Sequence, residues 1–254
     1  MKKIIFGILA VITIVIVACE KKDTIPDRTT LNPASSANIK GMHMSPDAPV
    51  FNIFVDTVKA LAALESNPDV ETGLSFGTIV PSLSNAYSIV TGGSHTIAAK
   101  VPSTSSTLPG QTIISKSANL VQGKFYTIAV VDSLSKLDAL IIEDDLSVAD
   151  TSKSYFRILN FMKGTADLEF QGSAGGYNFN KNGILFKSVS NFDTLKQGTY
   201  KIILRATGSS TRLDSIAAFA PVKGRKYTLY TRGVVGQTGG TNTKRPLLFA
   251  TQNL

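Results

Sequence analysis

Short runs of β-forming residues, separated by turn-forming groups, fill most of the chain and limit its fold more than any other feature. The turn groups are rich in Gly, Pro, Ser and Asp, as in Ser45-Pro46-Asp47-Ala48-Pro49 and Gly92-Gly93. Many short strands at such spacing are typical of antiparallel sandwiches and barrels. One segment, Val58–Glu65, is rich in Ala and Leu, and we expect a short surface helix there. The β-forming runs of the first half are Ile39–Met44, Val50–Asp56, Tyr87–Val90, His95–Val101, Thr112–Leu120, Phe125–Asp132 and Leu137–Glu143.

The second half of the chain repeats the first. A self-match at a spacing of about 100 residues indicates two tandem domains, because solenoid repeats are about 20–50 residues long. We therefore predict an all-β fold of two tandem Ig-like antiparallel β-sandwiches, at residues 38–149 and 150–254. The matching segments are Gly93–Ile97 with Gly198–Ile202, Gln122–Thr127 with Lys223–Thr228, and Ile39–Ile53 with Phe156–Phe170; His95 falls on Tyr200, and Tyr87 falls on Phe192.

The N-terminus has the pattern of a secretory signal peptide. Lys2 and Lys3 precede a mostly apolar run, Ile4–Ala18, which ends at Cys19, the only cysteine. This run is shorter than the roughly 20 apolar residues that a membrane-spanning helix needs. Residues 1–18 are therefore predicted to be a signal peptide, and the polar residues 19–37 a flexible tether. The alternative is a buried free cysteine at the end of an anchor helix.

Two histidines, His43 and His95, are the first candidates for catalysis. His43 lies close in sequence to Ser45 and Asp47, which suggests a Ser-His-Asp interpretation. Such triads are defined by geometry, however, and Ser45-Pro46-Asp47 has the composition of a turn. We expect Asp47 to cap this turn and His43 to end a strand. His95 shares a position with Tyr200, which indicates packing. No catalytic residue follows from these patterns, and we expect the protein not to be an enzyme.

Three consecutive acids, Glu143, Asp144 and Asp145, are candidate calcium ligands because hard cations prefer oxygen. Consecutive residues of a strand point to opposite faces, and no glycine-bearing calcium loop surrounds these three, so a solvated strand end is the favoured interpretation. No transition-metal or phosphate-binding motif occurs, and no cofactor is expected. The formal charge is +8, but the basic residues are scattered, with Lys223, Arg225 and Lys226 nearest to a cluster. We expect no nucleic-acid partner.

The segment Met42-His43-Met44-Ser45-Pro46-Asp47-Ala48-Pro49, with the strand-like Phe51–Asp56 after it, resembles the opening of the DUF4397 domain. Gly93–Ala98 and Gly123–Ala129 are also similar to elements of that family. The resemblance covers most of residues 38–146 and, in weaker form, 155–250, where Asn160–Thr165 replaces the Ser-Pro-Asp turn. It implies a secreted or cell-surface bacterial protein.

The run Ile16-Val17-Ala18-Cys19 resembles a bacterial lipobox, which implies that Cys19 carries a lipid and becomes the first residue of the mature chain. A lipobox, a polar tether and such domains together are similar to lipoproteins of the Bacteroidetes group. Glu20-Lys21-Lys22-Asp23 is loosely similar to their signals for the outer face of the outer membrane. The resemblance thus implies a cell envelope location, on the periplasmic or the surface face.

Three functions remain open from the sequence. The first is a non-catalytic surface interaction or structural lipoprotein, bound to the membrane through Cys19 and in contact with a surface protein or glycan. The second is a glycan-binding accessory of an outer-membrane uptake system; tryptophan is absent, so tyrosines would have to stack on the sugar. The third is a hydrolase that uses His43 or the acidic group. Asp132–Asp138 and Thr207–Arg212 are expected to be equivalent binding loops of the two domains. The candidate tyrosines are Tyr87, Tyr177 and Tyr230.

Overall fold

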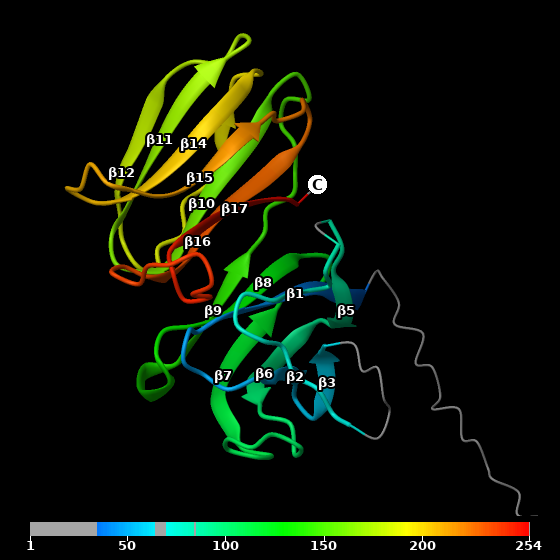
Figure 1. Cartoon of the computed structure of the whole chain (residues 1–254). Helices are drawn as coiled ribbons and strands as arrows, with labels where there is room; N and C mark the ends of the chain where they lie inside the picture. Colours follow the sequence, from blue (N-terminus) through cyan, green and yellow to red (C-terminus); the bar gives the residue numbers. More distant parts are fainter. Residues whose placement is uncertain (1–34, 64–69, 84, 254) are drawn as a thin grey trace, which may run out of the picture. The chain divides into compact units, whose positions relative to one another are not determined.

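The described chain is a succession of strands, the first beginning at Ser36 and the last ending at Gln252. A short 3-10 helix, η2 (Leu134–Lys136), lies between β8 (Phe125–Val131) and β9 (Asp138–Glu143). The structure is a computed structural model that describes residues 35–63, 70–83 and 85–253. The signal peptide, Cys19 and nearly all of the predicted tether lie outside these residues. The described strands form four sheets, which confirms the all-β sandwich class (Figure 1). In the described part of the chain, no helix has the length and apolar character needed to cross a membrane.

The first two sheets enclose one apolar core. Side chains such as Ile39, Ile53, Ile97 and Ile128 meet there and are almost fully buried. One sheet has the order β4-β1-β8-β9, with β5 also paired to β1, and the other has the order β3-β2-β6-β7. The strands are β1 (Ser36–Met44), β2 (Asn52–Val55), β3 (Val58–Leu61), β4 (Ile79–Val80), β5 (Ser88–Thr91), β6 (Gly93–Lys100), β7 (Thr112–Leu120), β8 (Phe125–Val131) and β9 (Asp138–Glu143).

The other two sheets enclose a second core, in which aromatic rings predominate. Phe170 stacks on Phe179 at a centroid distance of 4.2 Å, and the buried rings of Phe156 and Tyr200 pack beside them. The sheet orders are β13-β10-β16-β17 and β12-β11-β14-β15. The strands are β10 (Ser154–Lys163), β11 (Ala166–Ser173), β12 (Phe179–Ile184), β13 (Asp193–Leu195), β14 (Thr199–Ala206), β15 (Arg212–Phe219), β16 (Lys226–Val234) and β17 (Leu247–Gln252).

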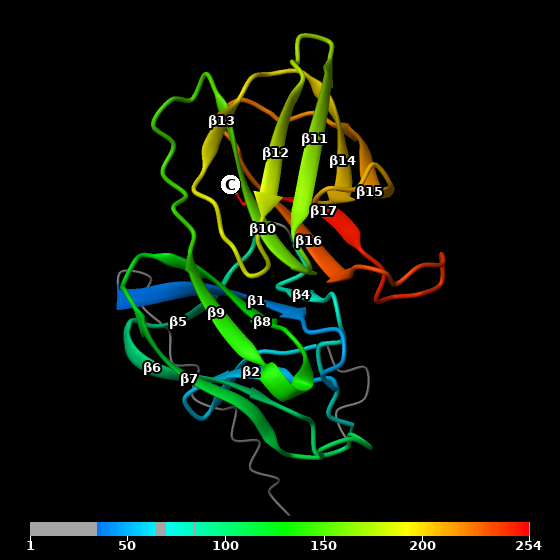
Figure 2. The same ribbon diagram turned by 90° about the vertical axis from the view of Figure 1, so that its left-hand side faces the viewer.

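The second pair of sheets repeats the strand order of the first, as Figures 1 and 2 allow the reader to trace. In each pair the first strand runs parallel to the next-to-last: β1 beside β8, and β10 beside β16. Hydrogen bonds repeat as well. The hydroxyl of Tyr126 accepts the amide of Val121 at 3.0 Å, and that of Tyr227 accepts the amide of Val222 at 3.0 Å. The internal match in the sequence therefore corresponds to a repeated topology.

A third apolar layer joins the two sandwiches; we call it the inter-sandwich interface. Strands β1, β8, β10 and β16 are buried on both faces, so alternate residues point into a sandwich core and into this interface. In β8, Ile128 packs in the first core while Ala129 and Val131 face the interface. All the described residues accordingly belong to one compact unit. The apolar interface residues are Met42, Met44, Ala129, Val131, Ile142, Leu159, Phe161 and Tyr230.

Two local predictions were wrong. The expected helix at Val58–Glu65 begins instead as β3, which pairs antiparallel with β2. Burial of Leu61 in the first core outweighs the high helical propensity of Ala and Leu. Asp132–Asp138 and Thr207–Arg212 also are not equivalent: residues 132–138 connect β8 to β9, whereas 207–212 connect β14 to β15. By contrast, the predicted strand Thr112–Leu120 has the bounds of β7.

Candidate functional site

The predicted turn motif lies at the end of β1, where His43 and Ser45 are fully buried. The His43 ring stacks on Phe51 with a centroid distance of 4.1 Å, and its Nε2 lies 3.2 Å from the carbonyl oxygen of Pro49. Asp47 is exposed and accepts the amide of Leu134 at 3.0 Å, which ties the turn to the start of η2. Burial lowers the pKa of His43 to about 4, so the imidazole is neutral at neutral pH.

The three residues of the Ser-His-Asp hypothesis are not assembled into a triad. The carboxylate of Asp47 bonds to Leu134, and Nε2 of His43 faces Pro49. The buried Nδ1 of His43 and Oγ of Ser45 have no hydrogen-bond partner among the described residues. His95 is also held in a structural contact, with Nδ1 2.8 Å from Asp56 and Nε2 2.9 Å from the carbonyl of Thr91.

The position shared by His95 and Tyr200 has a common bonding role. Each side chain bonds the carbonyl four residues before it, and Tyr200 donates to Lys196 at 2.7 Å. The physical requirement here is a side chain that reaches back over the preceding turn, which either ring can meet.

Each of the three consecutive acids pairs with a different cation, and so they are not gathered around one point. Glu143 lies 2.9 Å from Lys124, Asp144 pairs with Arg157, and Asp145 lies 3.5 Å from Lys226. Among the described residues, no three or more His, Cys, Asp and Glu side chains come together to hold a metal ion. These acids therefore act as ion-pair partners across the chain.

The pair Asp144–Arg157 is the centre of a buried polar network at the inter-sandwich interface. Its side chains are 0% and 2% exposed. One carboxylate oxygen of Asp144 accepts Arg157, and the other accepts the hydroxyls of Tyr87 at 2.8 Å and Thr127 at 2.7 Å. Arg157 also donates from Nε to Thr228 at 2.9 Å. The network thus links strands of both sandwiches. It gives hydrogen-bond partners to the buried carboxylate of Asp144 and to the buried guanidinium of Arg157.

The internal match between the two halves of the chain relates the residues around Asp144 and Arg157 to one another. Lys40 of β1 lies over the Tyr87 ring, 4.5 Å from its centroid, and Arg157 of β10 lies over the Phe192 ring at 4.8 Å. Cation and ring therefore occur at matching places in the two halves. Burial lowers the pKa of Lys40 to about 8, although Asp144 opposes the shift. The sequence signal for this network was a cation inside each of two matching strand-like segments, Lys40 and Arg157, and it was missed.

A second ionic cluster crosses the same interface from Asp132. Its carboxylate lies 2.8 Å from Nζ of Lys187 and 3.6 Å from Nζ of Lys163. Burial alone would raise the pKa of Asp132, but the hydrogen bonds from Lys187 and the Ser133 amide, with the charges of Lys187 and Lys163, together outweigh it and hold the pKa at about 2. Arg232 contributes a further contact: its guanidinium lies over the rings of Phe76 and Phe249, 4.9 Å from each centroid. Polar and cationic contacts thus surround the apolar interface.

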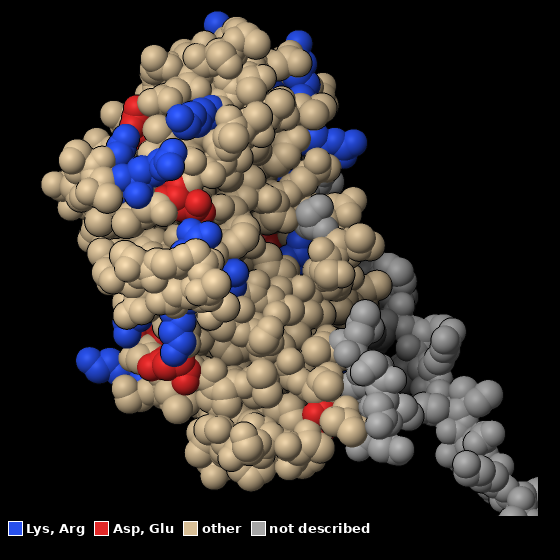
Figure 3. All heavy atoms as spheres, viewed as in Figure 1, with Lys and Arg blue, Asp and Glu red and all other residues tan. Residues whose placement is uncertain are grey.

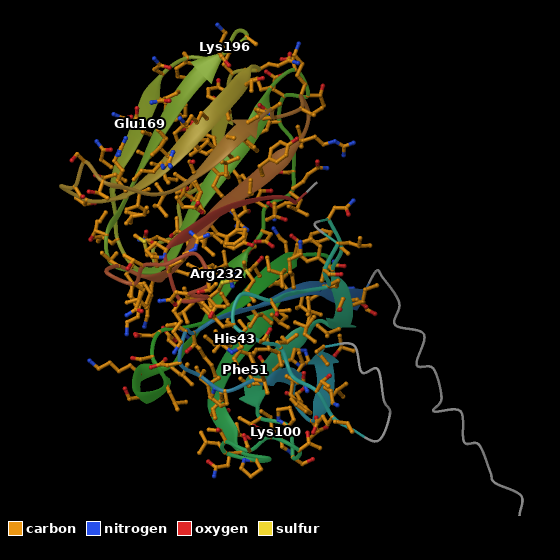
Figure 4. The ribbon with its side chains drawn as sticks, viewed as in Figure 1. His43, Phe51, Lys100, Glu169, Lys196 and Arg232 are labelled. Atoms are coloured by element: carbon orange, nitrogen blue, oxygen red, sulfur yellow. The ribbon has the colours of Figure 1, made fainter. Side chains whose placement is uncertain are left out.

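Of the three candidate tyrosines, Tyr177 is the exposed one, at 44% of the residue; Tyr230 is buried, and Tyr87 belongs to the interface network. Tyr177 lies on the loop between β11 and β12. It lines a hollow of about 540 Å³ formed by loops of the second sandwich. Figure 4 shows Lys196, another lining residue, at the end of this sandwich far from β1–β9. The hollow is lined by Ser152, Lys153, Gly175, Tyr177, Thr194, Leu195, Lys196, Gln197 and Lys223. We call it the loop-end hollow.

Charge elsewhere on the described surface is more evenly mixed. On the face shown in Figure 3, basic and acidic side chains lie next to one another. Arg205, for example, lies 3.0 Å from Glu169. A second hollow, near β12 and β13, contains the pair Lys181–Asp193, separated by 3.0 Å. The loop-end hollow differs, because its lining holds three lysines and no acidic residue.

Comparison with known proteins places the chain in a family. No curated protein matches it. Among solved structures, it resembles a "putative cell adhesion protein" from Bacteroides eggerthii, with a TM-score of 0.21 and 8% identity over 87% of this chain and 97% of that chain. A TM-score this low adds nothing to the description of the fold or the site. Residues 37–171, more than half of the chain, match the domain of unknown function DUF4397. The chain therefore belongs to the DUF4397 family.

Proposed function

We propose that the protein is a lipid-anchored lipoprotein of the cell envelope that acts as a non-catalytic interaction or structural module. The lipobox-like run that ends at Cys19 supports the anchor, and the polar segment after it supports a tether. In this proposal the signal peptide is residues 1–18, and the protein lies in the outer membrane of a Bacteroidetes-type bacterium. The partners that its folded part contacts are surface proteins or glycans.

The observation that supports this function most is the inter-sandwich interface. A continuous apolar layer, with Asp144–Arg157 at one side and Asp132–Lys187 at another, joins four sheets into one unit. Binding residues generally lie on loops that a rigid scaffold holds in place. A rigid pair of sandwiches suits the display of loops to a partner better than it suits domain closure over a substrate.

The state of the histidines supports a non-catalytic role. A general base works best with a pKa near the operating pH and within reach of its substrate. His43 is buried with a pKa of about 4, and His95 is engaged by Asp56 and Thr91. The acids that the sequence offered for hydrolysis each pair with a cation. These groups serve packing and pairing.

Replacing Cys19 with Ala should abolish lipid attachment. The thiol is the atom that the lipid would modify, and Cys19 is the only cysteine in the chain. Metabolic labelling with an alkyne fatty acid, followed by detergent phase partition, measures this directly. The control is Thr24→Ala in the tether, which should keep the label. Label retained on the Cys19→Ala protein, or missing from the wild type, would contradict the anchor.

The interaction itself can be tested with the full chain purified in mild detergent. We expect binding to at least one class of surface protein, matrix protein or glycan on broad arrays. Failure to bind across the arrays, together with turnover of a substrate, would replace this proposal with an enzymatic one. The glycan-binding alternative is favoured by one specific observation, the exposed ring of Tyr177 in a hollow lined by lysines.

A further inference from the structure

We propose that the loop-end hollow binds acidic sugar units of a polysaccharide, with Tyr177 as the stacking platform and Lys196 and Lys223 as the carboxylate partners. This inference rests on the proposed interaction function and names the ligand class for one site. It is carried by three features of the hollow: a supported aromatic ring, unneutralised positive charge, and a backbone that is held in place.

The Tyr177 ring is exposed on one side and supported on the other. Phe179 lies under it with a centroid distance of 5.0 Å, and Tyr200 meets it edge-on at 6.3 Å. Both supporting rings belong to the second core, so the platform is fixed to the sandwich. An aromatic face that is already in position costs little conformational entropy when a flat ligand stacks on it. The apolar C–H face of a sugar ring is such a ligand.

The charge of the hollow is positive. Lys153 is paired with Asp150, at 3.2 Å, whereas Lys196 and Lys223 have no ion-pair partner among the described residues. Two lysines without carboxylates favour an anion. The remaining polar lining, which includes Ser152, Thr194 and Gln197, offers hydroxyl and amide groups that suit sugar hydroxyls. The volume of about 540 Å³ is within the roughly 300–1,000 Å³ that is usual for ligand sites.

The loop that carries Tyr177 is held by close backbone contacts. Ala174 and Gly175 both have positive φ, 48° and 95°, and the amide of Gly176 bonds the carbonyl of Ser173 at 3.0 Å. A Cβ on Gly198 would lie 2.2 Å from the amide nitrogen of Gly176. This fixed turn brings the β11–β12 loop against the β13–β14 loop, and so it places the ring beside Lys196.

The first sandwich lacks this arrangement. Its β2–β3 connection is a tight turn in which Val55 pairs with Val58, while the equivalent β11–β12 loop extends from Ser173 to Phe179. The longer loop is what brings an aromatic ring to the end of the second sandwich. We therefore assign binding to the second sandwich alone.

Calorimetric titration of the full chain in mild detergent tests the assignment. The probe is a short oligogalacturonate, whose sugar units carry carboxylates, and the matched ligand is the same oligomer with its carboxylates methyl-esterified. We expect the charged oligomer to bind, its affinity to fall between about 50 mM and 300 mM salt because screening increases, and the ester to bind at least tenfold more weakly. Inorganic phosphate should compete poorly, since it cannot stack.

Three variants locate the site. Tyr177→Ala should weaken binding at least tenfold, and Lys196→Gln with Lys223→Gln should do the same and reduce the salt dependence. The control is Lys100→Gln with Lys136→Gln, which removes two exposed charges from the first sandwich and should change the affinity less than twofold (Lys100 is labelled in Figure 4). Thermal unfolding verifies that each variant is folded.

Several results would overturn the assignment. These are no heat with oligogalacturonate, equal binding of the ester, full competition by phosphate, or unchanged affinity in Tyr177→Ala. If the full chain still binds a surface protein or another glycan on arrays, only this inference fails and the interaction function stands. If it binds nothing and turns over a substrate, the proposed function fails with it.

Discussion

Replacing Arg157 with Leu should lower the free energy of unfolding by about 3–5 kcal/mol. The change removes the guanidinium that pairs with Asp144 and leaves its buried carboxylate with the hydroxyls of Tyr87 and Thr127 and the nearby charge of Lys40. An uncompensated buried charge is among the costliest defects in a protein interior. Denaturant unfolding of the wild type and the variant, at neutral pH and with matched m-values, measures the difference.

Two further variants separate the cost of leaving a charge buried from the cost of losing an arginine side chain. Arg205→Leu removes a partly exposed guanidinium that pairs with Glu169 (labelled in Figure 4), and it should cost less than about 1 kcal/mol because solvent screens this pair. Combining Arg157→Leu with Asp144→Leu should recover part of the loss, since the carboxylate that lost its guanidinium partner is then removed as well. An Arg157→Leu protein as stable as the Arg205→Leu protein would show that the network contributes nothing.

Acidification from pH 7 to pH 4.5 should lower stability by about 2–3 kcal/mol through His43 alone. The pKa of His43 is about 4 in the folded chain, because of burial, and about 6.5 in the unfolded chain. Between these values the unfolded state binds the proton and the folded state does not, so stability is fully present above pH 6.5 and declines toward pH 4. Unfolding free energies measured at intervals across this range give the slope.

The variant His43→Phe isolates this titration. A phenyl ring keeps the stack on Phe51 but cannot take a proton, and it leaves the Pro49 carbonyl without the imidazole. We expect lower stability at pH 7 and a flatter dependence on pH. Asp132, with a pKa held at about 2, contributes its loss of stability mainly below pH 4 and does not obscure the window. An equal slope in wild type and variant would exclude His43 as the source.

Local patterns predicted the strands and their repetition, because alternation and turn chemistry are encoded within a few residues. Thr112–Leu120 was predicted with the bounds of β7, and the pairing of Tyr87 with Phe192 reappears as two rings under two cations. The resemblance to DUF4397 was confirmed over residues 37–171.

What the sequence did not predict depends on contacts between distant segments. The burial of His43 follows from Phe51, on which its ring stacks, and from Phe76, which meets it edge-on, and neither lies in the turn motif itself. The Asp144–Arg157 pair crosses the inter-sandwich interface, so no local spacing rule marks it. The loop-end hollow combines residues from separate loops around Lys153, Tyr177, Lys196 and Lys223, which only the fold brings together.

The parallel pairing of β1 has a mechanical consequence for an anchored protein. β1 begins at Ser36, at the end of the predicted tether (residues 19–37), and pairs through seven residues with β8 and through four with β5. Tension applied along β1 would load these backbone hydrogen bonds together, in shear, instead of opening them one after another. With the proposed N-terminal anchor and a partner at the second sandwich, a pulling force would therefore enter the fold at β1.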